Sequence, residues 1–249
     1  MANKLLANKY QYDDLLIRSQ DPYANAKYEV ILKWLKARNI STILNAGCGS
    51  GELSFILAAN GYEVTSFDLD RDYIDLAKRK LKKMNFKNCT FFVSGIEDFI
   101  SRTKYDAVLA TDVLEHIEDD AGAFRELISF IRPGGMVVIT VPAGQYLFGF
   151  HDKQLGHFRR YSKTKFIKII PKSIHVKHLR YFGFFLIPVA FMISKVIRRS
   201  YPVAESADKK HNPIVSTVLR FIFRIEKSFA FPLGTGIIFC GIKRKINIF

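Results

Sequence analysis

A glycine-rich turn and an acidic residue beyond it are the first residues of this chain that could do chemistry. Residues 43–55 read ILNAGCGSGELSF, an apolar strand-like stretch that runs into Gly47, Gly49 and Gly51. Because glycine lacks a Cβ, the backbone of such a turn can approach a ligand and offer it N–H groups. Asp68 ends the next strand-like stretch, twenty-one residues after Gly47, where a carboxylate can accept hydrogen bonds from two ribose hydroxyls. Together they predict a nucleoside site; alone, Asp68 could be a solvated loop carboxylate.

The residue after the turn argues against a dinucleotide. The dinucleotide fingerprint places a third glycine where this chain has Glu52. A diphosphate beside Glu52 would also be repelled, so we expect a ligand without phosphate that presents a charged amino-acid end. This argues against a dehydrogenase. Asp70 stands directly before RDYIDLAK and is expected to cap a helix.

A second group of chemical side chains lies in residues 143–162, AGQYLFGFHDKQLGHFRRYS, a segment with loop character. Within eleven residues it holds two histidines, an aspartate, two arginines and a tyrosine: His151, Asp152, His157, Arg159, Arg160 and Tyr161. Histidine can act as a general base near neutral pH, and arginine offers forked donors to a carboxylate or a phosphate. The segment predicts a substrate-binding loop, or else a surface loop whose arginines pair with acids elsewhere.

Alternating strand and helix patterns must position these residues. Strands are predicted over 42–47, 63–68, 89–95, 105–112, 136–142, 174–184 and 234–245, and helices over 22–38, 52–61, 71–84, 119–131 and 163–170, the fourth of these helices closed by RPGG. Strands separated by helical crossovers indicate an α/β fold with a parallel sheet. Its carboxyl edge is where such folds place their sites, and both groups of chemical residues are expected there.

The order of the motifs resembles a known family. ILNAGCGSGELSFIL, VTSFDLD, YDAVLATDVLEHIED and LISFIRPGGMVVITVP resemble the successive motifs of class I S-adenosylmethionine-dependent methyltransferases, over about residues 25–145. The resemblance implies a Rossmann-like sheet of seven strands in the order 3-2-1-4-5-7-6, with the seventh strand antiparallel. It also implies S-adenosyl-L-methionine as the cofactor, while no metal site is predicted. Residues 22–145 would form the cofactor-binding core of a single domain over residues 1–249.

The resemblance also implies roles for individual residues. The glycine turn would line the methionine end of the cofactor, and Asp68 would hold the ribose. SGIEDF matches the segment that meets adenine, although many relatives have an aspartate where this chain has Gly95. The cofactor-binding residues implied in this way are Asn45, Gly47, Gly49, Gly51, Asp68, Leu69, Ile96, Glu97 and Asp112.

TDVLEHI, which the resemblance places beside the reacting methyl group, raises the question of a catalytic base. A base is needed only if the acceptor loses a proton, as a hydroxyl would. We expect it among His116, His157 and Asp152, with the alternative that His116 is structural. His151, Arg159, Arg160 and Tyr161 are expected to bind the substrate. The G-H-x-R-R-Y arrangement resembles a bacterial and archaeal subgroup that is associated with glycan or lipid-linked sugar pathways.

The excess of positive over negative charge lies in one part of the chain. Residues 1–150 hold 18 Lys and Arg against 19 Asp and Glu, whereas residues 151–249 hold 20 against 4. Within the second part, residues 184–232 form an apolar and basic insert between the last two predicted strands. The uncharged run YFGFFLIPVAFMIS is fourteen residues long, short of the ~20 that a spanning helix needs. The insert could pack on the sheet edge as core, or it could meet an anionic membrane surface.

These observations predict O-methylation of a small or lipid-linked acceptor, such as a glycan, a glycolipid or a quinone-like ring. An RNA or other nucleic-acid methyltransferase is the alternative, because the second part of the chain is basic. Against nucleic acid, the chain has neither an Asn/Asp-Pro-Pro-Tyr/Phe tetrad after the fourth predicted strand nor a cysteine that follows a proline. Three scattered cysteines and no visible export signal predict a cytoplasmic protein, with peripheral contact at the inner face of the membrane left open.

Overall fold

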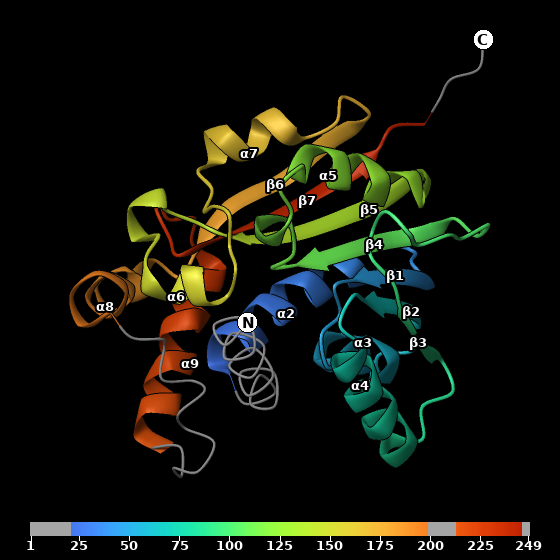
Figure 1. Cartoon of the computed structure of the whole chain (residues 1–249), viewed down its shortest axis with the longest axis horizontal. Coiled ribbons are helices and arrows are strands. Elements are labelled where there is room, and N and C mark those ends of the chain that lie inside the picture. Colours follow the sequence, from blue (N-terminus) through green and yellow to red (C-terminus); the bar gives the residue numbers. More distant parts are fainter. Residues whose placement is uncertain (1–20, 199–212, 246–249) are drawn as a thin grey trace, which may run out of the picture.

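A seven-stranded sheet organises the computed structural model, which describes residues 21–198 and 213–245 (Figure 1). The strand order is β3-β2-β1-β4-β5-β7-β6, and β7 runs antiparallel to both of its neighbours. The other neighbouring strands are parallel. The order and the reversed seventh strand that the resemblance implied are therefore confirmed. The strands are β1 (Thr42–Ala46), β2 (Glu63–Asp68), β3 (Cys89–Val93), β4 (Tyr105–Thr111), β5 (Ile131–Pro142), β6 (Ile174–Phe182) and β7 (Gly236–Lys243).

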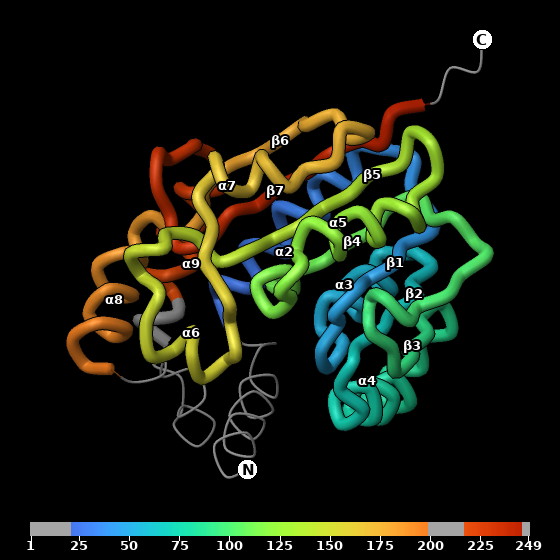
Figure 2. The backbone as a smooth tube through the Cα atoms, turned by 45° about the horizontal axis from the view of Figure 1, so that its top comes forward, coloured from blue at the N-terminus to red at the C-terminus, as the bar shows by residue number. Residues whose placement is uncertain are grey.

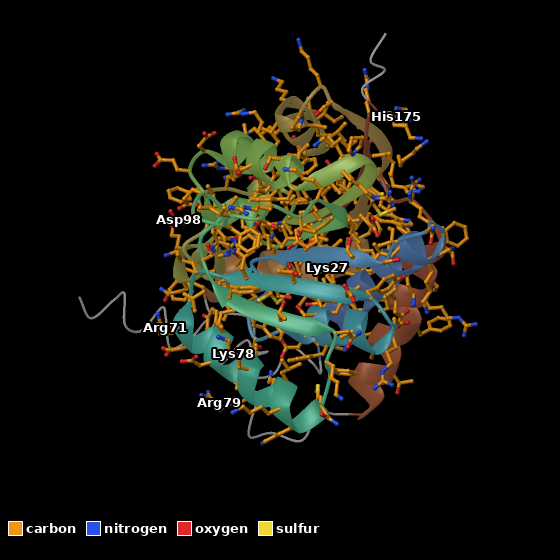
Figure 3. All side chains as sticks on the ribbon, turned by 90° about the vertical axis from the view of Figure 1, so that its right-hand side faces the viewer. Lys27, Arg71, Lys78, Arg79, Asp98 and His175 are labelled. Atoms are coloured by element: carbon orange, nitrogen blue, oxygen red, sulfur yellow. The ribbon has the colours of Figure 1, made fainter. Side chains whose placement is uncertain are left out.

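Helices cover both faces of this sheet (Figures 1 and 2). One face carries α2 (Pro22–Lys36), α3 (Glu52–Ala59) and α4 (Arg71–Met84), and the other carries α5 (Asp120–Ser129) and α7 (Lys163–Ile169). Figure 3 shows Lys78 and Arg79 on the outer face of α4, as the helical pattern predicted. Asp70 caps α4 by accepting the N–H groups of Asp72 and Tyr73, which confirms its expected role.

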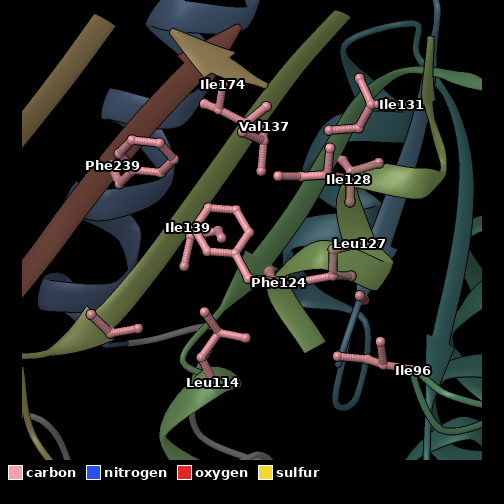
Figure 4. Close-up of a cluster of buried hydrophobic side chains, with 14 of the residues drawn as sticks. Ile96, Leu114, Phe124, Leu127, Ile128, Ile131, Val137, Ile139, Ile174 and Phe239 are labelled. Atoms are coloured by element: carbon pink, nitrogen blue, oxygen red, sulfur yellow. The ribbon is translucent and has the colours of Figure 1, made fainter. Parts of the chain in front are cut away.

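Side-chain alternation along the strands builds a core on each face. Val137 and Ile139 of β5 join the cluster under α5, whereas Val138 points to the cluster under α2 and α3. Figure 4 shows Phe124 of α5 packed over Ile139 and close to Phe239 of β7. Because these strands are buried on both faces, they read as continuous apolar runs in the sequence.

Two segments differ from the prediction. The strand β5 begins at Ile131, before the RPGG that was expected to lie outside the sheet, because Tyr105 pairs with Ile131 ahead of a register shift. The segment 143–162, expected to be a loop, contains two short helices, η3 (Gln145–Leu147) and α6 (Phe150–Gln154). The Asp152 carboxylate accepts the N–H of Gly149 at 2.9 Å and so fixes the start of α6.

The described parts of the insert between β6 and β7 are mainly helical. They contain η4 (Phe184–Leu186), α8 (Ile187–Phe191), the π-helical η5 (Met192–Ile197) and α9 (Pro213–Ser228). Buried Glu226 of α9 accepts the N–H groups of Gly183 and Phe185, which ties the two parts of the insert together. No helix within the described ranges is both long and apolar enough to cross a membrane.

Candidate active site

A cavity of about 1000 Å³ lies at the carboxyl ends of β1, β2, β3 and β4. Residues that directly follow these strands form one side of it, and examples are Gly47, Asp68, Ser94 and Asp112. The opposite side comes from α2, from the segment around α6 and from the insert. Parallel α/β sheets place ligands at this edge because the strand ends leave a crevice there.

The glycine turn after β1 has the backbone that a close approach requires. Gly47, Gly49 and Gly51 have φ values of 62°, 53° and 89°, in the left-handed region that favours glycine. A Cβ on Gly47 would lie 2.4 Å from a methyl carbon of Val113, so a larger residue cannot stand there without displacing its neighbour. Gly47 and Gly49 line the cavity, whereas Gly51 packs against Phe55 and Phe91.

Asp68 stands at the tip of β2 and is held by the backbone around it. Its Oδ2 accepts the N–H of Gly49 at 2.8 Å, and its Oδ1 accepts the N–H of Asp70 at 3.0 Å. An ionised carboxylate offers about four acceptor sites, so each oxygen can also accept a hydroxyl of a bound ribose. Asp68, which the sequence predicted at a ligand site, therefore lies on the cavity wall and is hydrogen-bonded directly to the glycine turn.

Two residues near the turn do not face the cavity. Glu52 was expected beside the ligand, but its carboxylate is buried, accepts the hydroxyl of Ser50 and pairs with Lys80. The argument that Glu52 would repel a diphosphate is therefore wrong, although the missing third glycine remains. Asn45 points away as well, since its side-chain amide donates to Ser54 at 2.9 Å.

Leu69 and residues 94–97 form the part of the cavity expected to meet adenine. Leu69 is 73% exposed and lies directly beside Asp68, so its apolar side chain is available to a ligand in the cavity. Ile96 is buried at the cavity wall, and Glu97 is exposed beside Gly95. The apolar Leu69 and Ile96 suit a purine ring, and Glu97 can accept a hydrogen bond from its amino group.

Asp112 has a partner that the sequence analysis missed. Its φ of 56° is rare for a residue other than glycine, and the Thr140 hydroxyl donates to Oδ1 at 3.0 Å. Its Oδ2 lies 2.5 Å from Nζ of Lys27, a buried lysine of α2 that is also labelled in Figure 3. Lys27 stands at helical spacing among the apolar residues Ala24 and Ile31, a signal that could have revealed it.

The two predicted bases Asp152 and His157 form one unit. Nδ1 of His157 lies 3.0 Å from Oδ1 of Asp152, and Nε of Arg160 donates to the same oxygen at 2.6 Å. Burial alone would raise the pKa of Asp152, but the hydrogen bond from His157 and the charge of Arg160 outweigh it and lower the pKa to about 2. Asp152 is fully buried and off the cavity wall, so the prediction that it acts as a base is wrong.

His157 itself reaches the cavity. Because an ionised Asp152 can only accept hydrogen bonds, we assign the proton of neutral His157 to Nδ1, which leaves Nε2 as the basic nitrogen. His116 also lines the cavity, with its ring edge-on to His157 at a centroid distance of 4.6 Å. A carboxylate, an imidazole that it orients and a cavity are the parts that general-base catalysis requires.

Glu115 joins the two histidines. One ligating atom from each of Glu115, His116 and His157 lies within 4.8 Å of the others, and Glu115 is fully buried. Two histidines and a carboxylate can hold a divalent transition metal. These donors come from two segments about forty residues apart, which local spacing in the sequence cannot detect, and the expectation that the chain holds no metal stays a prediction.

The remaining loop residues divide into two groups. His151 and Arg160 line the cavity, although Arg160 is only 4% exposed and is committed to Asp152. Arg159 and Tyr161 instead converge on Asp120 at the start of α5, at 2.8 and 2.7 Å. The prediction that Arg159 and Tyr161 bind substrate is wrong, because both fasten the loop to the fold.

Comparison with known proteins assigns the family. A family model described as a methyltransferase domain matches residues 38–174, more than half of the chain. The chain belongs to this methyltransferase family. The ubiquinone biosynthesis O-methyltransferases of Rickettsia akari and Vibrio parahaemolyticus are each 28% identical, over 152 and 138 residues. These alignments cover 55% and 53% of this chain and 60% and 54% of those proteins, so the chain spans little more than half the length of these curated relatives.

Solved structures of similar fold show how the methyltransferase is built. Coclaurine N-methyltransferase bound to N-methylheliamine and SAH has a TM-score of 0.59 at 14% identity, covering 87% of this chain and 71% of that one. Phosphoethanolamine N-methyltransferase 2 of Haemonchus contortus with S-adenosyl-L-methionine has a TM-score of 0.60 at 17% identity, covering 89% and 53%. The [4+2]-cyclase SpnF matches with a TM-score of 0.59 at 14% identity, covering 87% and 82%, so these likenesses show the fold alone.

The residues of the cavity fit the family's cofactor. The methyltransferase is of the S-adenosylmethionine-dependent class I type, and S-adenosyl-L-methionine is its cofactor. Gly47 and Gly49 line the cavity without side chains, where the amino-acid end would lie, and the two Asp68 oxygens can receive the ribose hydroxyls. The exposed side chain of Leu69 can cover the adenine ring.

Proposed function

We propose that this methyltransferase transfers a methyl group to a hydroxyl of a small or lipid-linked acceptor, such as a glycan, a glycolipid or a quinone-like ring. The observation that carries the proposal is the Asp152–His157 pair, which presents an oriented imidazole to the same cavity as the cofactor residues. An amine acceptor can react through its own lone pair, whereas a hydroxyl needs a base to take its proton. A buried carboxylate–histidine pair is that base.

The residues on the cofactor side of the cavity would bind and orient the cofactor. The Gly47 and Gly49 backbone, Asp68 and Leu69 would hold the cofactor at the strand ends, and Asp112, which is fixed by Lys27 and Thr140, lines the same cavity. S-adenosyl-L-methionine, when bound, supplies a methyl group that its sulfonium has already activated. The protein's own contribution is to align the acceptor with that group and to exclude water.

The opposite side of the cavity handles the proton. Nε2 of His157 accepts the hydroxyl proton, and the ionised Asp152 stabilises the imidazolium that forms through its bond to Nδ1. Asp152 stays ionised because Arg160 and the Gly149 N–H share its charge. Arg160 and the Gly149 N–H fix Asp152, and Asp152 in turn holds His157 in one orientation while the acceptor hydroxyl presents its proton.

The acceptor wall of the cavity is apolar, which favours an acceptor with a hydrocarbon or ring body. The insert contributes six apolar residues to this wall: Leu186, Val189, Ala190, Ile193, Leu219 and Phe223. The curated relatives named as ubiquinone biosynthesis O-methyltransferases support a quinone-like ring as one member of this class. A nucleic acid fits less well, because its backbone needs cations that line the site, and Lys27 and Arg160 are both paired with aspartates.

A labelling experiment tests the proposal. Purified protein and radiolabelled cofactor are incubated with fractionated cell extract, and label is counted in lipid, free sugar, RNA and protein fractions. We expect label in a lipid or small-molecule fraction, as an ether that resists mild acid and base, and its loss with His157→Asn. Label in RNA, or on a nitrogen atom, would overturn the proposed acceptor, and label unaffected by His157→Asn would overturn the base.

A further inference from the structure

The insert, residues 184–232, concentrates the exposed apolar side chains of the molecule. Twenty large apolar residues are exposed in the described parts of the chain, and nine of them lie in the insert. They are Phe185, Val189, Phe191, Met192, Val196, Ile197, Val218, Phe221 and Phe229. Exposed apolar residues that are concentrated in one segment indicate an interaction surface more strongly than single exposed residues do.

The spacing of these residues gathers them into two stripes. Phe185, Val189, Met192 and Val196 recur every three or four positions along η4, α8 and η5. Along α9, Val218 and Phe221 are three positions apart and point away from the buried Phe223 and Glu226. Residues at helical spacing share one face, so each segment buries one side and shows an apolar side to solvent.

The charge around the stripes has a single sign. Glu226 is the one acidic residue among the described residues of the insert, and it is buried and bonded to the N–H groups of Gly183 and Phe185. Arg198, Arg220 and Arg224 are exposed in the same segments. The surface therefore offers apolar groups and cations to a partner, and no exposed carboxylate within the described insert.

The same helices also form the acceptor wall of the cavity. Ala190 and Ile193 line the cavity from α8 and η5, and Leu219 and Phe223 line it from α9. Figures 1 and 2 both place α8 and α9 together with α6 at one end of the molecule, with α4 at the opposite end. Val189, which is 54% exposed, both lines the cavity and reaches solvent, whereas the other residues of the two stripes lie off the cavity wall.

We infer that the exposed face of the insert docks on an anionic phospholipid bilayer. Val218, Phe221 and Met192 enter the interfacial region, and the arginines meet lipid phosphates and anionic headgroups. A second copy of this chain is a poor occupant, because a self-contact would bring these cations against each other without an exposed acid to offset them. The further step, that the acceptor enters the cavity from the bilayer, rests on the proposed function.

Vesicle flotation tests the docking surface without acceptor or cofactor. Vesicles of phosphatidylcholine mixed with phosphatidylglycerol should carry the protein at low salt, with weaker binding at high salt and on phosphatidylcholine alone. Val218→Ser with Phe221→Ser should lower the partition coefficient of the protein onto vesicles roughly tenfold or more, because two large apolar groups no longer enter the interface. The matched control is Ile100→Ser with Ile167→Ser, two exposed residues outside the insert, which should leave binding unchanged.

A pair of charge variants separates a local surface from the overall charge of +15. Arg220→Gln with Arg224→Gln should weaken binding by roughly tenfold or more. Lys78→Gln with Arg79→Gln removes the same charge from the exposed face of α4 and should have little effect. Equal losses in the two variants would overturn the inference in favour of non-specific attraction.

Two further results would count against the docking surface. These are wild-type protein that does not float, and a dimer in sedimentation velocity that Val218→Ser with Phe221→Ser abolishes while flotation persists. Affinity for S-adenosylhomocysteine, measured for every variant, shows that each is folded. The labelling and flotation experiments also separate the two hypotheses. Protein that floats but yields no labelled lipid or small molecule would contradict only the proposed acceptor.

Discussion

The two sides of the cavity are built in different ways. The cofactor side consists of backbone and short side chains that directly follow neighbouring parallel strands, as with Gly49 and Asp68, which share a 2.8 Å hydrogen bond. The acceptor side is assembled from α2, the segment around α6 and the insert, which are distant in sequence. The first side follows from the topology of the sheet, whereas the second depends on long-range packing. The comparison teaches that a motif locates the cofactor residues, whereas only the assembled fold shows which of the candidate bases is bonded to a carboxylate at the cavity.

Replacing the imidazole tests the acceptor side most severely. His157→Asn removes the base and leaves the cofactor residues in place, so kcat should fall by about 10²- to 10⁴-fold, the usual contribution of general-base catalysis. The affinity for S-adenosylhomocysteine in calorimetry should not change. Asn at the neighbouring His151, which lines the cavity without the Asp152 bond, is the control and should cost much less. A kcat within tenfold of wild type for His157→Asn would remove the distinction between the two sides.

The carboxylate behind His157 should show itself in acid stability. The folded pKa of Asp152 is about 2, below the ordinary aspartate pKa of 3.8, so its contribution to the free energy of unfolding is present above the unfolded pKa and is lost as pH falls through the folded pKa. The contribution is about 2 kcal/mol at neutral pH and about half of that near pH 3. The free energies of unfolding of wild type and Asp152→Asn, measured by urea denaturation, should therefore converge as the pH is lowered. A stability difference that does not vary with pH would mean that the carboxylate is not ionised in the fold.

The cofactor side should respond to the loss of Asp68. Asp68→Ala should weaken S-adenosylhomocysteine binding by about tenfold or more, because hydrogen bonds to a charged group are worth about 1.5–3 kcal/mol each. Asp70→Ala is the matched control two residues away. It removes the cap of α4 and should cost about 1 kcal/mol of stability while leaving the affinity nearly unchanged. Equal affinity losses in the two variants would show that Asp68 acts through the fold.

The smallest effect is expected from Arg159. Its guanidinium pairs with Asp120 and donates to the Glu118 carbonyl, its side chain is 28% exposed, and Arg159 itself does not line the cavity. Arg159→Ala should cost less than about 1 kcal/mol in the free energy of unfolding and should leave kcat and KM unchanged. Thermal denaturation and turnover measure the two quantities. A large rise in KM would return Arg159 to the acceptor site.

Local sequence was sufficient to predict the positions of most strands of the sheet. The period of apolar residues located six of the seven strands to within about two residues, and β5 was misjudged only at its start, where Ile131 pairs with Tyr105 across a register shift. Strand ends in a parallel sheet are neighbours by construction, so Gly47, Asp68 and Asp112 could be assigned to one edge from spacing and resemblance. Asn45 shows the limit, because the orientation of one strand side chain toward Ser54 depends on α3.

The sequence by itself determined the order of strands and helices, the glycine turn, the acidic residue beyond it and the excess of positive charge after residue 150. These are properties of residue type and spacing, and they hold whatever the distant parts of the chain do. Tertiary structure alone decided that Asp152 serves His157, that Arg159 and Tyr161 fasten the loop to Asp120, and that Lys27 of α2 meets Asp112. Each of these roles is an ion pair or hydrogen bond whose partner is fixed by packing. A charged group that leaves water takes the nearest partner in space, and spacing in the sequence cannot show which partner that is.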